Sequence, residues 1–324
     1  MNRIVSLIYR RLALSIFIAI LAASAVFFGT EVLPGDALTA TIPQDELIWM
    51  TDADLARMRT ELGLDKPVYE RFSTVIWNLI TFDFGLSTIT KEPVWEFISH
   101  PMKNSLIMAG TAVILTPIFS IVLGVFASLK PGGRVDNAIS GVTLFSYSMP
   151  DFVVGNIFII IFGIWLAIAP AVLMVSKSAP ALEMMAVSFL PVLALVVSGI
   201  AYQFRLLRAG MVEALDSDYV ERARLSGVPE LRLVFVHALP SALIPMLNGL
   251  AQWVAGIISG VVVIEAVFKY PGIGLELVRS ISGREIPVVQ AIAFLAAFAV
   301  IFTNLLADLS ILALDPRVRR DSNG

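Results

Sequence analysis

The stretch NSLIMAGTAVILTPIFSIVLGVFASL, residues 104–129, carries no charge and is long enough to cross the hydrocarbon core of a membrane as one helix. Five further stretches share this property: 12–30, 152–176, 184–204, 233–264 and 286–307. Inside lipid, the backbone amides must be satisfied within their own segment, so each stretch is predicted to be helical. None alternates apolar and polar residues as a strand of a membrane barrel would. The sequence therefore predicts an all-α integral membrane protein with six transmembrane helices.

The composition supports this class and excludes others. Of 324 residues, 57% are hydrophobic and only 15% are charged, against about 25% in ordinary soluble domains. The absence of cysteine excludes disulfides, thiol catalysis and cysteine-ligated metals. His100 and His237 are far apart, which gives no sign of a metal site. The net charge of −3 does not favour a nucleic-acid partner.

The distribution of Lys and Arg predicts the orientation. Six spans place both termini on one side, where 13 basic residues lie, against 4 in the short loops opposite. By the positive-inside rule, both termini are cytoplasmic. The first apolar run has 19 residues, longer than the core of a signal peptide, and is read as an uncleaved anchor. The predicted organisation begins with a cytoplasmic N-terminus (1–11), a first span (12–33) and an extracytoplasmic segment (34–103). A membrane core with five spans (104–314) and a cytoplasmic tail (315–324) follow. The membrane core includes a cytoplasmic loop (205–240) and an outer loop (269–285).

The extracytoplasmic segment carries its own helix signals. Asp52 is expected to cap a helix that Gly63 stops. Pro67 is expected to open a second helix. Phe84-Gly85-Leu86 is typical of a turn. A segment of this size would have a marginal core alone, so a helical cap packed on the bundle is favoured over an independent domain.

The cytoplasmic loop contains a short helix with clear boundary signals. Asp218 and Glu221 have the spacing of a capping box, Gly227 supplies a left-handed stop, and Pro229 prevents continuation. Such a helix either docks in a groove of another protein or lies on the lipid surface, and the residues alone leave both open. The side chains expected to be exposed on it are Tyr219, Val220, Ala223 and Leu225.

A family pattern runs through this loop. Glu221-Arg222-Ala223 is followed by three residues, Gly227, nine residues and His237-Ala238-Leu239-Pro240. This resembles the EAA signature of binding-protein-dependent ABC importer permeases, with Arg222 in place of the usual Ala and His237 in place of the usual Ile. His before Ala-Leu is typical of the dipeptide, oligopeptide and nickel branch of these permeases.

Other stretches agree with that branch along essentially the whole chain and in order. They are Arg10-Arg11-Leu12, Pro34-Gly35-Asp36, the run from Glu61 to Pro67, the run from Asp83 to Ser87, Pro93-Val94, the run from Glu265 to Gly274, and Pro287-Val288-Val289-Gln290. The long first outer segment resembles the first permease of the usual pair. The resemblance implies the type I ABC importer fold with six transmembrane helices.

The resemblance also implies a role and partners. The chain would be a permease of the bacterial inner membrane, in contact with lipid and working with a second, similar permease, two ATPase subunits and an extracytoplasmic solute-binding protein. The sequence has no Gly-Lys dipeptide and therefore no phosphate-binding loop. The chain is thus expected to be a non-catalytic subunit without a cofactor, with ATP and Mg²⁺ bound by its partners. Di- or oligopeptides are favoured over nickel complexes as the solute because no Cys or His cluster is present.

The resemblance makes residues 218–227 the coupling helix that docks on an ATPase subunit. A helix fixed at both ends can pass a rigid-body displacement to the neighbouring spans. The residues expected to make this contact are Asp218, Tyr219, Glu221, Ala223, Arg224 and Gly227.

Polar residues inside apolar spans are candidates for the translocation path. Asp151 follows Pro150 and either faces the pore, where it would meet a substrate amine, or is hydrogen-bonded to Ser146, Ser148 or Asn156. Asn248 and Gln252 are four apart and share one helix face. They either line the path or join helices to one another.

The run from Glu265 to Gly274 is a candidate outer gate. Glu265 is four residues from Lys269, which would also allow a purely structural ion pair. Gly272 and Gly274 permit the backbone turns that a gating loop needs. The gate residues implied by the signature are Glu265, Phe268, Pro271, Gly272 and Gly274.

Two other functions compete with this interpretation. A secondary, ion-coupled transporter or channel subunit would usually show internal repeats and coupling carboxylates, whereas Asp151 is the one deep carboxylate. An intramembrane enzyme would need a catalytic motif, and neither His-Glu-x-x-His nor Gly-x-Ser-x-Gly occurs.

Overall fold

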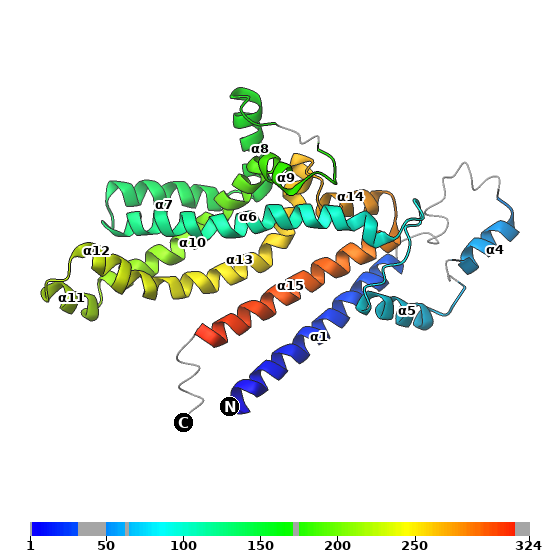
Figure 1. The fold of residues 1–324 in the computed structure, drawn as a ribbon, viewed down its shortest axis with the longest axis horizontal. Coiled ribbons are helices and arrows are strands. Elements are labelled where there is room, and N and C mark those ends of the chain that lie inside the picture. The colour runs from blue at the N-terminus through cyan, green and yellow to red at the C-terminus, as the bar shows by residue number, and fades with distance from the viewer. Residues whose placement is uncertain (1, 32–49, 62–64, 171–174, 315–324) are drawn as a thin grey trace. The chain divides into compact units, whose positions relative to one another are not determined.

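The computed structural model describes residues 2–31, 50–61, 65–170 and 175–314, and their regular elements are all helical (Figure 1). This confirms the predicted all-α class. The chain divides into two compact units. Of the described residues, the first unit, called the peripheral unit, contains 2–31, 50–61, 65–103 and 272–305. The second, called the core unit, contains 104–170, 175–271 and 306–314.

Five helical stretches of the described chain are long and apolar enough to cross a membrane. A sixth span is obtained only when two helices that meet at an angle of 107° are counted together. The first five comprise α1 (Asn2–Glu31), α6 (Val94–Ser128), α10 (Phe189–Leu215), the run of α12 (Glu230–Arg232), η2 (Leu233–Ala238) and α13 (Leu239–Phe268), and α15 (Ile286–Leu314). The bent pair is α7 (Arg134–Tyr147) and α8 (Asp151–Phe158), which the π-helix η1 (Ile159–Trp165) extends.

The predicted bounds of the span over residues 152–176 are wrong. Helical structure there ends at Trp165, and the missing length is supplied by α7. Pro150 causes the break, because its ring fixes φ and it has no N–H to continue the ladder of α7. Residues 137–150 are uncharged, but they are too few to cross the membrane alone, and Asp151 separates them from the apolar run that starts at 152.

The core unit is held together by close backbone contacts around α10, which lies beside α13 and α7 (Figure 1). A Cβ placed on Gly199 of α10 would lie 2.5 Å from the ring of Trp253 and 2.8 Å from the methyl group of Thr116. A Cβ on Gly210 would lie 3.0 Å from the Cα of Ala242. Small residues allow this approach, which drives helix association in lipid, where apolar burial alone gives little.

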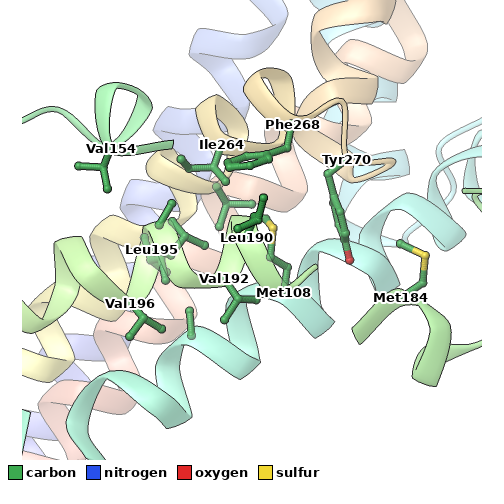
Figure 2. Packing of buried hydrophobic residues seen from close by; sticks show 14 residues of the cluster. Met108, Val154, Met184, Leu190, Val192, Leu195, Val196, Ile264, Phe268 and Tyr270 are labelled. Carbon is green, nitrogen blue, oxygen red and sulfur yellow. The ribbon is translucent and has the colours of Figure 1, made fainter. Parts of the chain in front are cut away.

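An apolar cluster fills the end of the core unit where α13 finishes. Figure 2 shows the side chains of Ile264 and Phe268 on one side of this cluster, next to Leu190. Ile264 and Phe268 are completely buried, as is Met108 of α6. Helix α9 (Ala181–Val187) contributes the buried Met184. This packing fixes the end of α13 before the chain enters the following loop.

The peripheral unit contains α4 (Asp52–Glu61), α5 (Val68–Ile80), α14 (Ile273–Ser282) and the apolar part of α15. Its core includes Leu79, Ile98 and Ile292. Two predictions are confirmed here. Helix α5 begins directly after Pro67, and Gly85 lies in a turn with φ of +68°, a left-handed conformation that favours glycine.

The predicted start of α4 is wrong by one residue. The capping residue is Thr51, whose Oγ1 accepts a hydrogen bond from the N–H of Asp54 at 3.3 Å. The N–H of Thr51 donates in return to Oδ2 of Asp54 at 3.2 Å. This reciprocal pair is a capping box in which Asp54 takes the third helical position. The stop that was predicted at Gly63 lies outside the described residues.

Candidate functional site

Helix α11 (Asp218–Leu225) is the short helix predicted in the loop after α10. Its N-cap is Ser217, in an extended conformation, and the Ser217 carbonyl accepts hydrogen bonds from the N–H groups of Val220 and Glu221. The capping box predicted from Asp218 is therefore wrong by one position. Asp218 and Glu221 still lie in the first turn, where negative charge stabilises a helix.

The other end of α11 is fixed by Gly227, as predicted. Its φ is +82°, and its N–H donates to the carbonyl of Arg224 at 3.0 Å. The next N–H, that of Val228, donates to the carbonyl of Ala223 at 3.2 Å. These two bonds make a Schellman motif, which satisfies carbonyls that the helix end would leave unpaired. Pro229 then begins the next helical run.

The exposed face of α11 differs from the prediction. Val220, which was expected to be exposed, is completely buried, and Ala223 is half-buried. Tyr219 is partly exposed, but its hydroxyl lies 3.2 Å from the carbonyl oxygen of His237 and 3.2 Å from Oγ of Ser241. Val220 and Tyr219 therefore hold α11 against the start of the α12–α13 run.

A second tie crosses the corner at Gly227. Nε and Nη2 of Arg224 donate to the two carboxylate oxygens of Glu230 at 2.9 and 3.4 Å, and this pairing raises the pKa of Arg224. Tyr219 and Arg224 are exposed but bound to their own chain; the other exposed side chains of α11 are Asp218, Glu221, Arg222 and Leu225, the last of them 82% exposed. The free surface of α11 is thus a charged face with one large apolar side chain.

A buried ion pair in the core unit was not predicted. Asp136 of α7 is only 1% exposed, and it accepts two hydrogen bonds from the guanidinium of Arg208 on α10, with Nη2 to Oδ2 at 2.6 Å. The N–H of Gly132 at 2.8 Å and the hydroxyl of Ser140 at 3.2 Å complete the carboxylate's partners. The two residues are 72 positions apart, so no local pattern points to the pair.

Asp151, the path candidate at the bend, is half-buried at the start of α8. Its Oδ2 would lie 2.9 Å from a Cβ placed on Gly260 of α13, so the carboxylate lies directly against that glycine. The alternative of a hydrogen bond to Ser148 or Asn156 is wrong, because both donate to backbone carbonyls of preceding residues. Ser146 has no partner in the described chain, so it does not bind Asp151 either.

Asn248 and Gln252 lie on an exposed face of α13. Neither side chain has a hydrogen bond to another helix within the described residues. The alternative that they join helices of this chain to one another is therefore not supported. With Gly256 and Gly260 they form a row spaced by four residues, about 18 Å long at 1.5 Å per residue. Asp151 lies against the far end of this row, which we call the α13 stripe.

The predicted outer gate contains a buried polar cluster at the end of α13. The Glu265 carboxylate is completely buried and accepts a hydrogen bond from the hydroxyl of Ser105 on α6. The Tyr270 hydroxyl donates to the Asn104 carbonyl at 2.9 Å, and Nδ2 of Asn104 donates to the Pro271 carbonyl at 2.9 Å. Figure 2 shows the Tyr270 oxygen directed toward α6, and burial raises the pKa of this phenol.

Two details of the gate prediction are corrected. Glu265 is bound by Ser105, while Lys269 is exposed and ends α13 in a left-handed conformation with φ of +55°. Gly272 has an extended backbone and Gly274 lies in the first turn of α14, so neither has the positive φ expected of a glycine turn. Phe268 and Pro271 are buried, as a packed rather than an open loop requires.

Comparisons with known proteins agree with this geometry. The family model described as binding-protein-dependent transport system inner membrane component matches residues 120–320. The chain is 31% identical to the di/tripeptide transport system permease protein DppB of Pseudomonas aeruginosa, over 97% of this chain and 98% of the relative. It is 30% identical to the dipeptide transport system permease protein DppB of Lactococcus lactis, over 97% and 99%.

A solved structure shares the fold. It is described as the crystal structure of an amino acid ABC transporter with histidines, and it matches with a TM-score of 0.51 at 16% identity. The match covers 66% of this chain and 92% of the other.

Proposed function

This chain belongs to the binding-protein-dependent inner membrane components of ABC importers, as a multi-pass permease subunit, and we propose that its solutes are di- or oligopeptides. The observation that carries the proposal is its similarity, almost from end to end, to permeases named for dipeptide and di/tripeptide transport.

Helix α11 is the coupling helix in this proposal. It would dock on an ATPase subunit that binds ATP and Mg²⁺, while this chain stays non-catalytic. Asp218 and Glu221 would meet the partner directly, together with Leu225, because they are exposed. Ala223 and Gly227 would set the shape of the helix and its corner. Tyr219 and Arg224 would not bind the partner; they would hold α11 in position against the α12–α13 run.

The α13 stripe is the proposed wall of the translocation path. Asn248 and Gln252 offer amide groups to a passing peptide backbone, and Asp151 offers a carboxylate to its ammonium group. A stripe exposed on one chain needs a second surface to enclose a cavity. This supports pairing with a second, homologous permease, in a heterodimer.

The Glu265 cluster is the proposed outer gate, where a solute-binding protein would deliver the peptide. Buried polar contacts at Glu265, Tyr270 and Pro271 would hold the end of α13 in place until the partners move it. Phe268 packs in the apolar cluster and would keep this end closed to water. Gly272 and Gly274 would serve as the connection into α14.

The orientation proposed for the chain follows its charges. Both termini and the 205–240 loop would be cytoplasmic, whereas the 34–103 segment and the 269–285 loop would face the binding protein in the bacterial envelope.

The test is transport by the complex purified through a tag on this chain. The complex is reconstituted in liposomes with its solute-binding protein on one side and ATP on the other, and entry of a labelled dipeptide is measured. We expect uptake to require both ATP and the binding protein. Uptake by this chain alone along an ion gradient would instead support a secondary transporter. ATP-driven uptake of another solute, with none of peptides, would overturn the peptide assignment.

A further inference from the structure

We propose that Asp136 and Arg208 form a positioning pair that passes the movement of the coupling helix to α7, and through α7 to the bend beside Asp151. The proposal rests on the function proposed above. The two residues of the pair neither touch the ATPase nor line the translocation path. They connect the helix that docks on the ATPase to the bend at Asp151, which lines the path.

The pair has the geometry of a rigid joint. Two guanidinium nitrogens of Arg208 bind the two oxygens of one carboxylate, an arrangement that fixes orientation as well as distance. The Gly132 N–H binds the same carboxylate, so the turn that starts α7 is fixed to it too. The Asp136 carboxylate is buried, which shields its side of the joint from water, whereas the Arg208 side chain is 32% exposed.

A second contact joins the same two helices. The guanidinium of Arg205 lies over the ring of Tyr147, 4.8 Å from its centroid. Tyr147 is the last residue of α7, and Asp136 is in its first turn. Two arginines three residues apart on α10 therefore hold both ends of α7. Because α7 is held at two points, it must follow α10 as a rigid body.

The connections on either side of this unit are short. Helix α10 ends at Leu215, and only Asp216 and Ser217 separate it from α11. The Ser217 hydroxyl donates back to the carbonyl of Ala214, which tightens that junction. At the far end of α7, three residues lead to Asp151 and the bend of 107°. A displacement of α11 would thus be transmitted to Asp151 through α10 and α7, which are joined by the Asp136–Arg208 pair and connected to α11 and to α8 by short linkers.

A role in stability alone does not explain an ion pair at this place. A buried ion pair costs desolvation, and well-packed apolar residues of similar size are often at least as stable. What an apolar contact cannot supply is the fixed orientation that two hydrogen bonds to one carboxylate give to α7 and α10.

The first experiment compares three variants of the complex in liposomes. Asp136→Asn removes the charge, Arg208→Lys keeps the charge but loses the two-pronged geometry, and Arg134→Gln is the control. Arg134 is exposed at the same end of α7 and has no ion pair in the described chain. Peptide uptake and ATP hydrolysis are measured together. We expect uptake per ATP to fall at least about tenfold in the first two and to stay unchanged in the control.

A covalent replacement separates positioning from folding. The chain has no cysteine, so Asp136→Cys with Arg208→Cys introduces the only two. We expect this variant to be uncoupled when reduced and to regain uptake per ATP when a short bifunctional thiol reagent joins the two sites. The same reagent on the unmodified complex is the control. Normal coupling in well-assembled Asp136→Asn, or no recovery after cross-linking, would overturn the proposal.

A readout that needs no solute keeps this result distinct from the proposed function. Val135, in the first turn of α7 beside the charged Arg134, is 58% exposed, so Val135→Cys reports the surroundings of α7 through its rate of labelling by a maleimide. We expect ATP to change this rate in the complex and to have no effect once Asp136→Asn is added. Absence of peptide uptake in the unmodified complex would refute the peptide assignment. An ATP effect that persists in Asp136→Asn would refute the pair.

Discussion

Substitutions of Gly227, which ends the coupling helix, allow the effect of backbone conformation on coupling to be measured without a steric clash inside this chain. Gly227 has φ of +82°, and a Cβ placed on it would have no atom within 4 Å. A side chain at this position therefore meets open space, and its whole cost is the left-handed backbone. We predict that coupling falls in the order Gly, Asn, Ala, Val as residue 227 is varied.

The magnitudes follow from the conformation. Holding an ordinary residue in the left-handed region costs about 1–2 kcal/mol, while Asn is tolerated more easily and a β-branched residue less. Ala is therefore expected to shift the equilibrium of the corner toward other conformations by about 5- to 30-fold. Gly110 provides the control, because it lies within α6 with no atom within 4 Å of a Cβ. Gly110→Ala is expected to stabilise its helix by about 0.5–1 kcal/mol.

The assay is uptake per ATP hydrolysed, with the amount of ATPase retained on the tagged complex measured in parallel. Gly227→Ala should lower both quantities, and Gly110→Ala should lower neither. If Gly227→Val supported uptake equal to that of the unmodified chain, the left-handed corner would not be required for coupling. A loss as large in Gly227→Asn as in Gly227→Val would also refute the argument, because it would show sensitivity to any side chain rather than to φ.

Three further predictions concern other parts of the chain. Gly199→Ala should destabilise the purified complex by about 1–3 kcal/mol through contact with the Trp253 ring, and Trp253→Phe should recover part of that loss in a thermal unfolding cycle. Glu265→Ala should lower the melting temperature more than Glu265→Gln, because only the first removes the side-chain oxygen that accepts the hydrogen bond from Ser105, a loss of about 1–3 kcal/mol. Hydrogen bonds from Thr51 hold the pKa of Asp54 below the usual pKa of an aspartate. The cap of α4 should therefore be intact at any pH above the usual pKa and be lost as the pH falls through the lowered pKa of Asp54. Hydrogen exchange of the α4 amides measures this loss, and unchanged protection at low pH would contradict the prediction.

The features that the sequence predicted correctly depend on neighbours along the chain. Uncharged runs located the spans, because lipid excludes charge from every residue of a spanning helix. Gly227 followed by Pro229 located the end of α11, because both residues act on their own backbone. The starts of α4 and α11 were each placed one residue late. In both, an Asp follows a Thr or Ser that takes the N-cap position. The Thr51 hydroxyl accepts a capping hydrogen bond, whereas the Ser217 hydroxyl donates to the Ala214 carbonyl.

The features that could not be predicted depend on residues brought together by the fold. No pattern in the sequence around Asp136 points to its partner, because only the packing of α7 on α10 places it against Arg208. The bent α7–α8 span was missed for a different reason. Residues 137–150 are uncharged but too few to cross the membrane alone, and Asp151 separates them from the run that follows. One carboxylate at a bend thus divides a single span into two runs when only uncharged stretches are counted.

The contacts of α11 separate two roles within one signature. Tyr219 and Arg224 bind groups of their own chain, so a change there alters where the helix lies. Glu221 and Leu225 are exposed, so a change there alters what the helix meets. Arg222, which departs from the family signature, belongs with the second pair, because its guanidinium makes one bond to the carbonyl of Asp218 and otherwise faces outward. A substitution of the first kind loosens coupling while the ATPase stays bound, and one of the second kind releases the ATPase itself.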